Sequence, residues 1–429
     1  MRKKIFSGIL VFLLVTLFNA PILKADERDE QISVLKTQVE DLLKRIEKLE
    51  AGQAKAKEES LKAKEELAKI KETTQTVQAA RVDLANPLAK LKLKGRAALG
   101  FFDSGKAGSY PSGSFEVPEA KLQFGFQPDD INNIILRFNL NNATFNNVDY
   151  FYVDTDLKKL LNLGFPISSR LGKMKVDFGE ETWGNNSVES VLPSASAANV
   201  NGNDEGLQLS GKLGKDKPLG YSIAVDNGSA GTGFDTSTAK AFAGKLYYNI
   251  IDPLYISASY YNSGQMKASN SELGIGGLVS PPTGAVKRTR QMWEVDLRYD
   301  FQKGKTMNPP AFCDSKAFVR LSYGGFSDDV SGGTISKRDG TIGFIEGTYN
   351  LTKKFYVATR ASFIDLDGTT TATLNRVTAN KYDRYSLGGG YRLSNNILLK
   401  LGYDWNRSSG PGLDDAGDNL LAAIVASQF

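Results

Sequence analysis

The fold of this chain is decided by an alternating stretch at residues 291–301, Gln291-Met292-Trp293-Glu294-Val295-Asp296-Leu297-Arg298-Tyr299-Asp300-Phe301. From Trp293 onward, every second side chain is large and apolar, and every intervening one is charged. Successive side chains of a β-strand point to opposite faces, so this strand has one apolar and one charged face. A soluble sandwich would put the charged face outside. A membrane barrel turns the same pattern inside out, with charge facing an aqueous lumen.

The same period of two recurs along most of the chain after about residue 88. It predicts an all-β transmembrane barrel of about sixteen antiparallel strands within residues 86–429. The expected strands lie at 88–104, 115–128, 131–142, 148–159, 167–178, 205–214, 217–228, 238–251, 252–264, 289–302, 314–328, 338–351, 352–367, 381–394, 395–408 and 417–429.

The connections between these segments favour the barrel over the sandwich. Tight turns such as 128–130 and 252–253 alternate with long polar connections such as 179–204 and 265–288. Short turns on the periplasmic side and longer loops outside are typical of outer-membrane barrels. A closed barrel also leaves no free strand edge, which lipid would penalise, and a barrel of this size encloses an aqueous channel.

The N-terminus has the features of a secretory signal peptide at residues 1–25. Arg2, Lys3 and Lys4 precede an apolar run at 5–18 that is too short to span a membrane, and cleavage is expected after Ala25. The alternative is an uncleaved N-terminal anchor.

Residues 26–80 are rich in Glu, Lys, Leu and Ala and predict an α-helical coiled coil in the periplasm. Its seam alternates β-branched residues with leucines, in the order Ile32, Leu35, Val39, Leu42, Ile46 and Leu49. A long helix cannot bury such a stripe on itself, so a second copy of the segment is the expected partner. We expect a homotrimer, with cell-wall contact through the coiled coil. A solvated charged helix or a disordered linker is the alternative.

Composition excludes several classes of protein. The chain has 53 Lys and Arg against 48 Asp and Glu, for a formal charge of +5, so no nucleic-acid partner is expected. It has no histidine, which excludes hydrolysis by a Ser–His pair, and we expect no enzyme activity. The single cysteine, Cys313, permits neither an intrachain disulfide nor a thiolate metal cluster. No cofactor and no metal site are expected.

Two segments carry a resemblance to known families. The apolar end Leu420–Phe429 resembles the terminal strand of outer-membrane porins, which implies that Phe429 is part of the signal for the barrel-assembly machinery. Residues 170–181, followed by 189–193 and 206–211, resemble the phosphate-selective porin O and P family. That resemblance implies a homotrimeric, sixteen-stranded, anion-preferring channel in the outer membrane of a Gram-negative bacterium. Two departures, Asp177 in place of a proline and Asn203-Asp204 in place of an arginine, weaken the implication of phosphate.

Charges on the lumen face are the candidate selectivity groups. The alternation places eight basic side chains of interest there, with Lys173 and Lys175 as the first expected anion contacts. The candidate pore-lining, anion-binding residues are Lys173, Lys175, Arg137, Lys212, Lys245, Arg298, Arg320 and Arg360. The alternative is that these are ordinary solvated charges that keep the channel wet.

The long connection 179–204 is the expected constriction loop. Its candidate residues are Glu180, Glu181, Asn185, Asn186 and Glu189. A tight phosphate filter needs converging basic groups, and this connection has none. The sequence therefore predicts a general porin for small hydrophilic solutes, with a weak preference for inorganic anions, phosphate among them.

Two other functions fit a barrel in a lipid bilayer. A carbohydrate porin would need an aromatic track along the lumen, and Tyr150, Tyr152 and Tyr247 do not form a continuous one. A structural protein could use the coiled coil to tether the outer membrane to the cell wall.

Overall fold

The structure is a computed structural model that describes residues 36–37, 40–41, 44–45, 90–141, 148–184, 186–214, 218–228, 239–268, 273–278, 282, 284–301, 316–368, 370–410 and 417–429. The chain divides into two units, Met1–Asn86 and Pro87–Phe429. In the first unit the described residues are helical and exposed, and Arg45 pairs with Asp41 one turn away at 2.9 Å. The expected signal peptide, the seam of the expected coiled coil and Cys313 lie outside the described residues.

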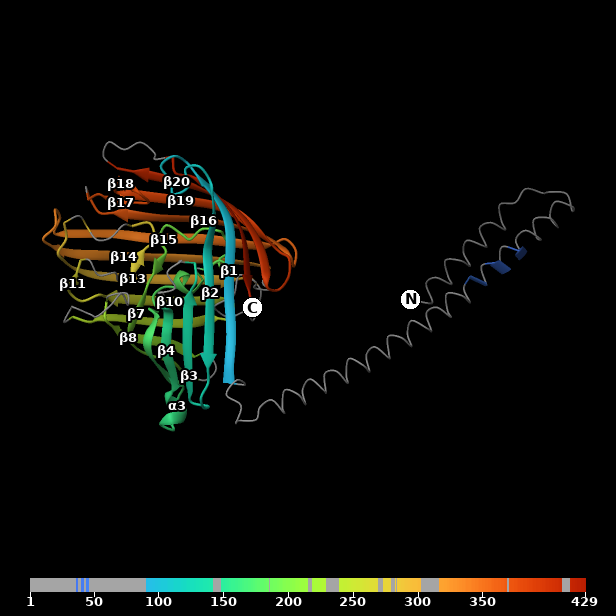
Figure 1. The fold of residues 1–429 in the computed structure, drawn as a ribbon, viewed down its shortest axis with the longest axis horizontal. Coiled ribbons are helices and arrows are strands. Elements are labelled where there is room, and N and C mark those ends of the chain that lie inside the picture. The colour runs from blue at the N-terminus through green and yellow to red at the C-terminus, as the bar shows by residue number, and fades with distance from the viewer. Residues whose placement is uncertain are drawn as a thin grey trace. The chain divides into compact units, whose positions relative to one another are not determined.

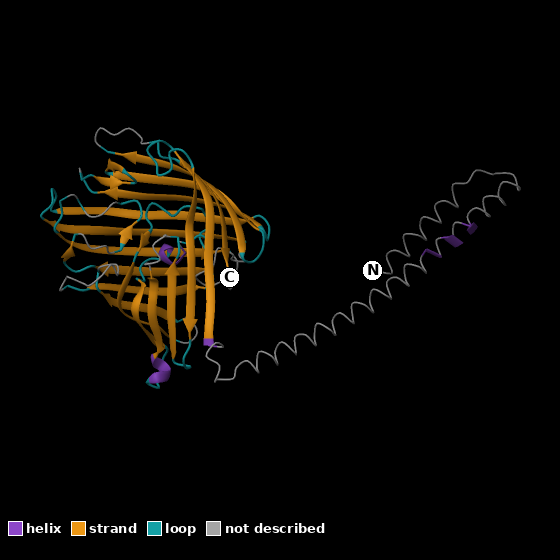
Figure 2. Cartoon of the chain, viewed as in Figure 1, coloured by secondary structure: helices purple, strands orange, loops and turns teal. Residues whose placement is uncertain are grey.

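The second unit is a closed antiparallel barrel of 16 strands (Figures 1 and 2). Each strand pairs with the next around the ring, and β21 returns to pair with β1, with Arg96 opposite Gln428 and Ser104 opposite Leu420. In ring order the strands are β1 (Leu91–Ser104), β2 (Ser114–Phe126), β3 (Asn132–Asn139), β4 (Val148–Asp156), β5 (Ile167–Lys175), β7 (Asn203–Leu213), β8 (Leu219–Asp226), β9 (Ala241–Ile251), β10 (Leu254–Asn262), β13 (Lys287–Asp300), β14 (Ala317–Ser331), β15 (Lys337–Asn350), β16 (Phe355–Leu366), β19 (Lys381–Arg392), β20 (Ile397–Ser409) and β21 (Leu420–Gln428). Each predicted strand overlaps one of them, so the predicted fold class is confirmed.

Most connections alternate in length as the sequence predicted, with one reversal: the connection after β13, 301–316, is long and the one after β14, 332–336, is short. Short ones follow β2, β9, β15 and β19, and α3 (Leu157–Leu160) lies in the connection after β4. Long ones follow β5, β10 and β16 and contain the remaining small elements. These are α4 (Glu181–Gly184), β6 (Val200–Asn201), β11 (Met266–Lys267), β12 (Gly274–Ile275), β17 (Ala372–Leu374) and β18 (Val377–Ala379). Within the described residues, no helix is long and apolar enough to cross a membrane.

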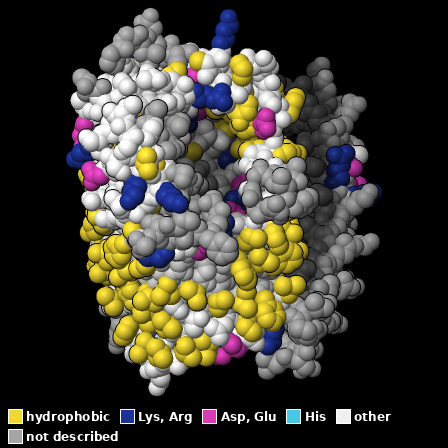
Figure 3. All heavy atoms as spheres, turned by 60° about the vertical axis from the view of Figure 1, so that its left-hand side comes forward, with side chains coloured by type: hydrophobic (Ala, Val, Ile, Leu, Met, Phe, Trp, Pro, Cys, Tyr) yellow, Lys and Arg dark blue, Asp and Glu magenta, His cyan; other side chains and the backbone are white. Residues whose placement is uncertain are grey.

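The barrel is apolar outside and charged inside. On β13, Trp293 and Val295 are 44% and 38% exposed, whereas Glu294 and Asp296 are 4% and 3% exposed. Figure 3 shows hydrophobic side chains gathered over the lower part of one face of the molecule. This is the arrangement expected when the outside of the barrel meets lipid.

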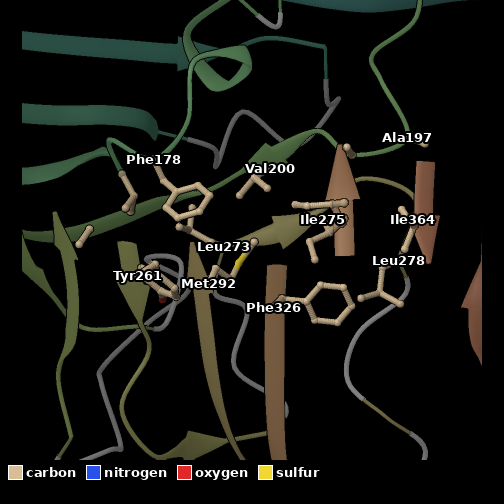
Figure 4. Packing of buried hydrophobic residues seen from close by; sticks show 14 of the residues in the cluster. Phe178, Ala197, Val200, Tyr261, Leu273, Ile275, Leu278, Met292, Phe326 and Ile364 are labelled. Atoms are coloured by element: carbon tan, nitrogen blue, oxygen red, sulfur yellow. The ribbon is translucent and has the colours of Figure 1, made fainter. Parts of the chain in front are cut away.

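A second hydrophobic core, which we call the inner core, lies inside the barrel. It joins lumen-facing strand residues such as Met292 and Phe326 to loop residues such as Val200 and Leu273 (Figure 4). Met174 of β5 belongs to the same cluster. Backbone pairing joins the loops that supply it: β6 pairs with β12, β17 pairs with β18, and Leu278 forms a β-bridge with Leu374. The inner core was not predicted, because the long connections are polar in overall composition. It removes part of the lumen from the solute path.

The C-terminus completes the closure of the barrel. The backbone N–H and C=O of Phe429 both bond to Gly95, at 3.0 and 3.1 Å. The Phe429 ring lies against Gly95, and a Cβ added at Gly95 would come within 2.2 Å of it. An aromatic ring covering a strand glycine replaces the side-chain packing that the glycine lacks.

We predict that Gly95→Val destabilises the barrel by about 1–3 kcal/mol, because the added side chain displaces the Phe429 ring. Urea unfolding in vesicles, followed by heat-modifiable gel mobility, measures the effect. Ala97→Val is the matched control, since Ala97 is the next outward-facing residue of β1 and is exposed. Equal stability of the two variants would contradict a structural role for the ring.

Candidate pore

A basic cavity lies between the first strands of the barrel and the connection 176–202 that folds inward after β5. Its volume is about 280 Å³. It is lined by Arg96, Lys121, Gln123, Arg137, Asp149, Tyr150, Tyr152, Lys175, Trp183, Asn186, Glu189, Asn201 and Asn203. A second cavity of about 280 Å³ shares Arg96, Lys121, Gln123, Arg137 and Glu189 with it and extends to Lys94 and Phe429. We call the two together the basic passage, and it opens at the rim that carries the chain's C-terminus.

Neighbouring strands bring the basic residues of the passage together. Arg96 of β1 lies opposite Lys121 of β2, and Gln123 of β2 lies opposite Arg137 of β3. Their side chains share one face with the charged side of the alternation. Three cations therefore gather on the wall within two residue positions of one another.

A β-bulge adds a carboxylate to this wall. Arg137 pairs with Tyr150 and Phe138 with Val148, which leaves Asp149 as the extra residue on β4. Asp149 forms ion pairs with Lys121 at 2.9 Å and with Arg137 at 2.6 Å. Bulges re-aim side chains in this way next to functional sites. Strict alternation would have directed Asp149 outward, because Tyr150 faces the lumen.

Lys175 lies beside the passage at the end of β5. The pairing of β4 with β5 ends at Phe151 and Lys173, whereas β5 stays paired with β7 up to Lys175, which lies opposite Asn203. One face of this end carries Met174 into the inner core, and the other carries Lys175 into the passage. The Lys175 ammonium donates to the Thr182 carbonyl and lies 5.6 Å from the Trp183 ring. It has no carboxylate partner within the described part of the chain.

The lining of the first cavity carries four cations and two carboxylates. Arg96 also pairs at 2.8 Å with Glu119, which accepts a hydrogen bond of 2.7 Å from the Ser187 N–H. Glu119 thus fastens the loop to the wall. Arg137 lies 3.5 Å over the Tyr150 ring, which fixes its guanidinium plane. The passage therefore retains a modest cationic excess.

Most acidic residues of the constriction loop face the wall rather than the passage. Glu180 pairs with Lys245 at 2.8 Å and accepts a hydrogen bond from Tyr255. Glu181 accepts from the Ser196 N–H at 2.9 Å and lies 3.4 Å from Arg360. Glu189 lines the passage, and Asn186 caps the turn before it by accepting from the Val188 and Glu189 N–H groups. Asn185 lies outside the described residues. The acidic composition of the loop therefore overstates the negative charge that a solute meets.

Two of the candidate pore-lining residues are anchors of this loop. Lys245 binds Asp177 at 3.3 Å and Glu180, and donates to the Gly179 carbonyl at 2.8 Å. Arg360 contacts Glu181 and Glu346 and donates to the Ser194 carbonyl. The alternation placed both on the lumen face, and the loop then covers them.

The other candidates are dispersed around the barrel. Arg137 and Lys175 line the passage. Arg298 is buried beside Asp300 and over the Phe318 ring, and Arg320 pairs with Glu346. Lys212 is exposed near the end of β7.

Lys173 pairs with Phe151, which is 56% exposed on the outer face, so its lumen position in the prediction is corrected. Leu171 and Lys173 lie on the same face of β5, one apolar and one charged. The alternation of apolar and charged residues therefore does not show which face of this strand points to the lumen.

Sequence reasoning missed Arg96, Lys121 and Trp183. A signal for Arg96 was present, because Lys90, Lys92, Lys94 and Arg96 alternate with apolar or small residues. Lys121 and Trp183 had no comparable signal. Their position depends on the register between strands and on the fold of the loop.

Comparison with solved structures shows a shared fold at low sequence identity. The outer membrane channel DcaP of Acinetobacter baumannii matches with a TM-score of 0.55 and 12% identity, over 79% of this chain and 97% of that chain. The anion-selective porin from Comamonas acidovorans matches with a TM-score of 0.51 and 12% identity, over 79% and 99%. The trimer form of OmpT, an outer membrane protein of Vibrio cholerae, matches with a TM-score of 0.51 and 11% identity, over 79% and 99%. No protein-family model and no curated protein sequence matches the chain.

We predict that Lys245→Met releases the constriction loop from the wall. The change leaves the Asp177 and Glu180 carboxylates without their shared cation, and breaking a buried pair in this way costs about 3–5 kcal/mol. Single-channel recordings should show larger and more fluctuating conductance than in the unaltered protein.

Arg298→Gln is the control for Lys245→Met, because it also removes a buried lumen cation but one whose ion pair is with Asp300 of its own strand. A steady, unchanged conductance in Lys245→Met would contradict the anchoring role.

Proposed function

We propose that this chain is an outer-membrane channel for passive diffusion of small hydrophilic solutes, with a weak preference for anions. The observation that carries the proposal is the basic passage. Arg96, Lys121, Arg137 and Lys175 converge there on a path bounded by the barrel wall and the inward loop. Rings or ladders of charge at the narrowest section are what select ions in such channels.

The fold supports the outer membrane of a Gram-negative bacterium as the location. A closed sheet with an apolar outer face and a charged inner face is stable only with lipid outside and water inside. Two of the proteins with the same fold are described as an outer membrane channel and as an anion-selective porin. A diffusion channel, rather than an enzyme, is the function that this arrangement favours.

The preference is proposed to be weak, and phosphate is not its specific target. Asp149 forms ion pairs with Lys121 and Arg137, and Glu189 adds a second carboxylate to the passage. A site for phosphate would need several uncompensated donors in reach of one ion. The passage instead suits small anions in general. Membership of the phosphate-selective porin O and P family is proposed from the sequence resemblance alone.

A homotrimer is proposed for the assembly, with residues 26–80 as its periplasmic coiled coil after removal of residues 1–25. A trimer form is described for a protein with the same fold, which supports an assembly of three subunits. The backbone pairing of Phe429 with Gly95 supports a role for Phe429 in assembly of the barrel. Contact of the coiled coil with the cell wall belongs to the same proposal.

A carbohydrate channel is the second candidate, favoured by the aromatic residues of the passage. Tyr150, Tyr152 and Trp183 all line it. Arg137 covers the Tyr150 ring and Arg170 lies 4.1 Å over the Tyr152 ring, so these faces are occupied by cations rather than open for a sugar. The anion channel is therefore preferred.

We predict that the purified channel is anion-preferring in a KCl gradient across a planar bilayer, and that Arg137→Gln with Lys175→Gln reduces the preference. Each change removes a cation from the passage, so the reversal potential should move toward the cation side. Glu189→Gln should move it in the opposite direction, because it removes a carboxylate from the same passage.

Arg298→Gln tests whether any buried lumen cation has the same effect on the reversal potential. It should leave the potential unchanged, because Arg298 does not line the passage. A cation-preferring unaltered channel, or equal shifts from Arg298→Gln and the passage variants, would overturn the proposal.

We predict that deletion of 26–80 leaves single-channel conductance unchanged but lowers the thermal stability of the trimer, measured by the temperature at which it dissociates on a gel. Loss of envelope integrity with a trimer of unchanged stability would favour the tether function instead.

A further inference from the structure

An apolar groove crosses the outer face of the barrel far from the passage. One row of outward-facing residues, Val319, Gly347, Thr359 and Leu387, runs across β14, β15, β16 and β19. The groove has a volume of about 290 Å³ and is bounded on one side by Phe301 and Tyr349. Gly347 forms its floor, because a Cβ added there would meet no atom closer than Thr359 Cγ2 at 4.0 Å.

Basic residues lie at the rim next to this groove. The Lys316 ammonium lies 4.6 Å from the Tyr349 ring, which borders the groove. Lys353 and Lys354 are exposed in the adjoining connection 351–354, and Arg392 donates to the Lys353 carbonyl at 3.4 Å. The segments 316–319, 347–359 and 387–396 contain these four cations and no acidic residue.

The rim in question is the one with most of the short connections, which faces the periplasm in barrels of this kind. On another connection of this rim, Lys159 lies 3.8 Å from the Asp130 carboxylate.

We infer that the groove and its basic rim bind one anionic glycerophospholipid of the periplasmic leaflet. The acyl chain lies in the hollow over Gly347, and the phosphate lies among Lys316, Lys353 and Lys354. The occupant is a lipid, because the groove opens on the apolar outer face and lysines near the surface attract anionic headgroups. This inference is independent of the ion preference of the passage.

Native mass spectrometry of the purified full-length protein tests the site, with phosphatidylglycerol and phosphatidylcholine of matched chains as competing probes. The unaltered protein should retain phosphatidylglycerol at least about fivefold better, the effect of roughly one surface cation. Gly347→Leu should lose both lipids, because the side chain fills the hollow. The triple change K316Q, K353Q and K354Q should keep a lipid but lose the headgroup preference.

Two control variants match these changes on other parts of the surface. Ala258→Leu adds the same bulk to an exposed outward position on β10, and Lys159→Gln removes a cation from another short connection; both should retain phosphatidylglycerol as the unaltered protein does. Heat-modifiable gel mobility verifies that each variant is folded.

Three results would overturn the inference. Equal retention of the two lipids by the unaltered protein would remove the charge argument. Full retention by folded Gly347→Leu would remove the groove argument. Disulfide cross-linking between copies through Thr359→Cys would show that the groove is a contact between copies of the chain rather than a lipid site.

Discussion

Closure of the backbone hydrogen-bond ring is the constraint on which the rest of this structure depends. Lipid offers no partner for a free N–H or C=O, so every strand needs two neighbours and the first must meet the last. Here β21 pairs with β1, and Phe429 extends that pairing to Gly95. Once the ring is closed, the strand period alone sends apolar residues outward and charged residues inward. The lumen is thus lined with charge before any loop enters it.

The inward loops decide how much of that charge a solute meets. The inner core joins three long connections to the loop-side half of the wall. Lys245 and Arg360 bind the carboxylates of the constriction loop, and Lys400 donates to the Ser190 carbonyl at 2.9 Å. These cations therefore act on the loop rather than on the solute. What remains open is a narrower passage beside β1–β4, where the cations of the wall slightly outnumber the carboxylates.

The strands could be predicted from the sequence because they follow from a local period and a common environment. Trp293 and Glu294 are placed by alternation, and lipid fixes which faces outward. The pore could be predicted only in part, since its residues depend on contacts between distant segments. Asp149 enters through a bulge, and Lys175 enters at the end of β5, where β5 is paired with β7 but no longer with β4. Glu180 and Glu181 look like pore charges in sequence, but their partners on β9 and β16 turn them away.

The central claim is that solutes pass beside β1–β4 through a cationic section. Gln123 lines both cavities of the basic passage, so Gln123→Cys, with Cys313 replaced by serine, places a reporter in that section. Charged thiosulfonate reagents applied during bilayer recording measure how accessible this thiol is. The ratio of the rates for anionic and cationic reagents measures the sign of the electrostatic potential around it. The account predicts that the anionic reagent reacts faster than the cationic one and that its reaction reduces the conductance. Equal rates, or modification that leaves the conductance unchanged, would contradict it.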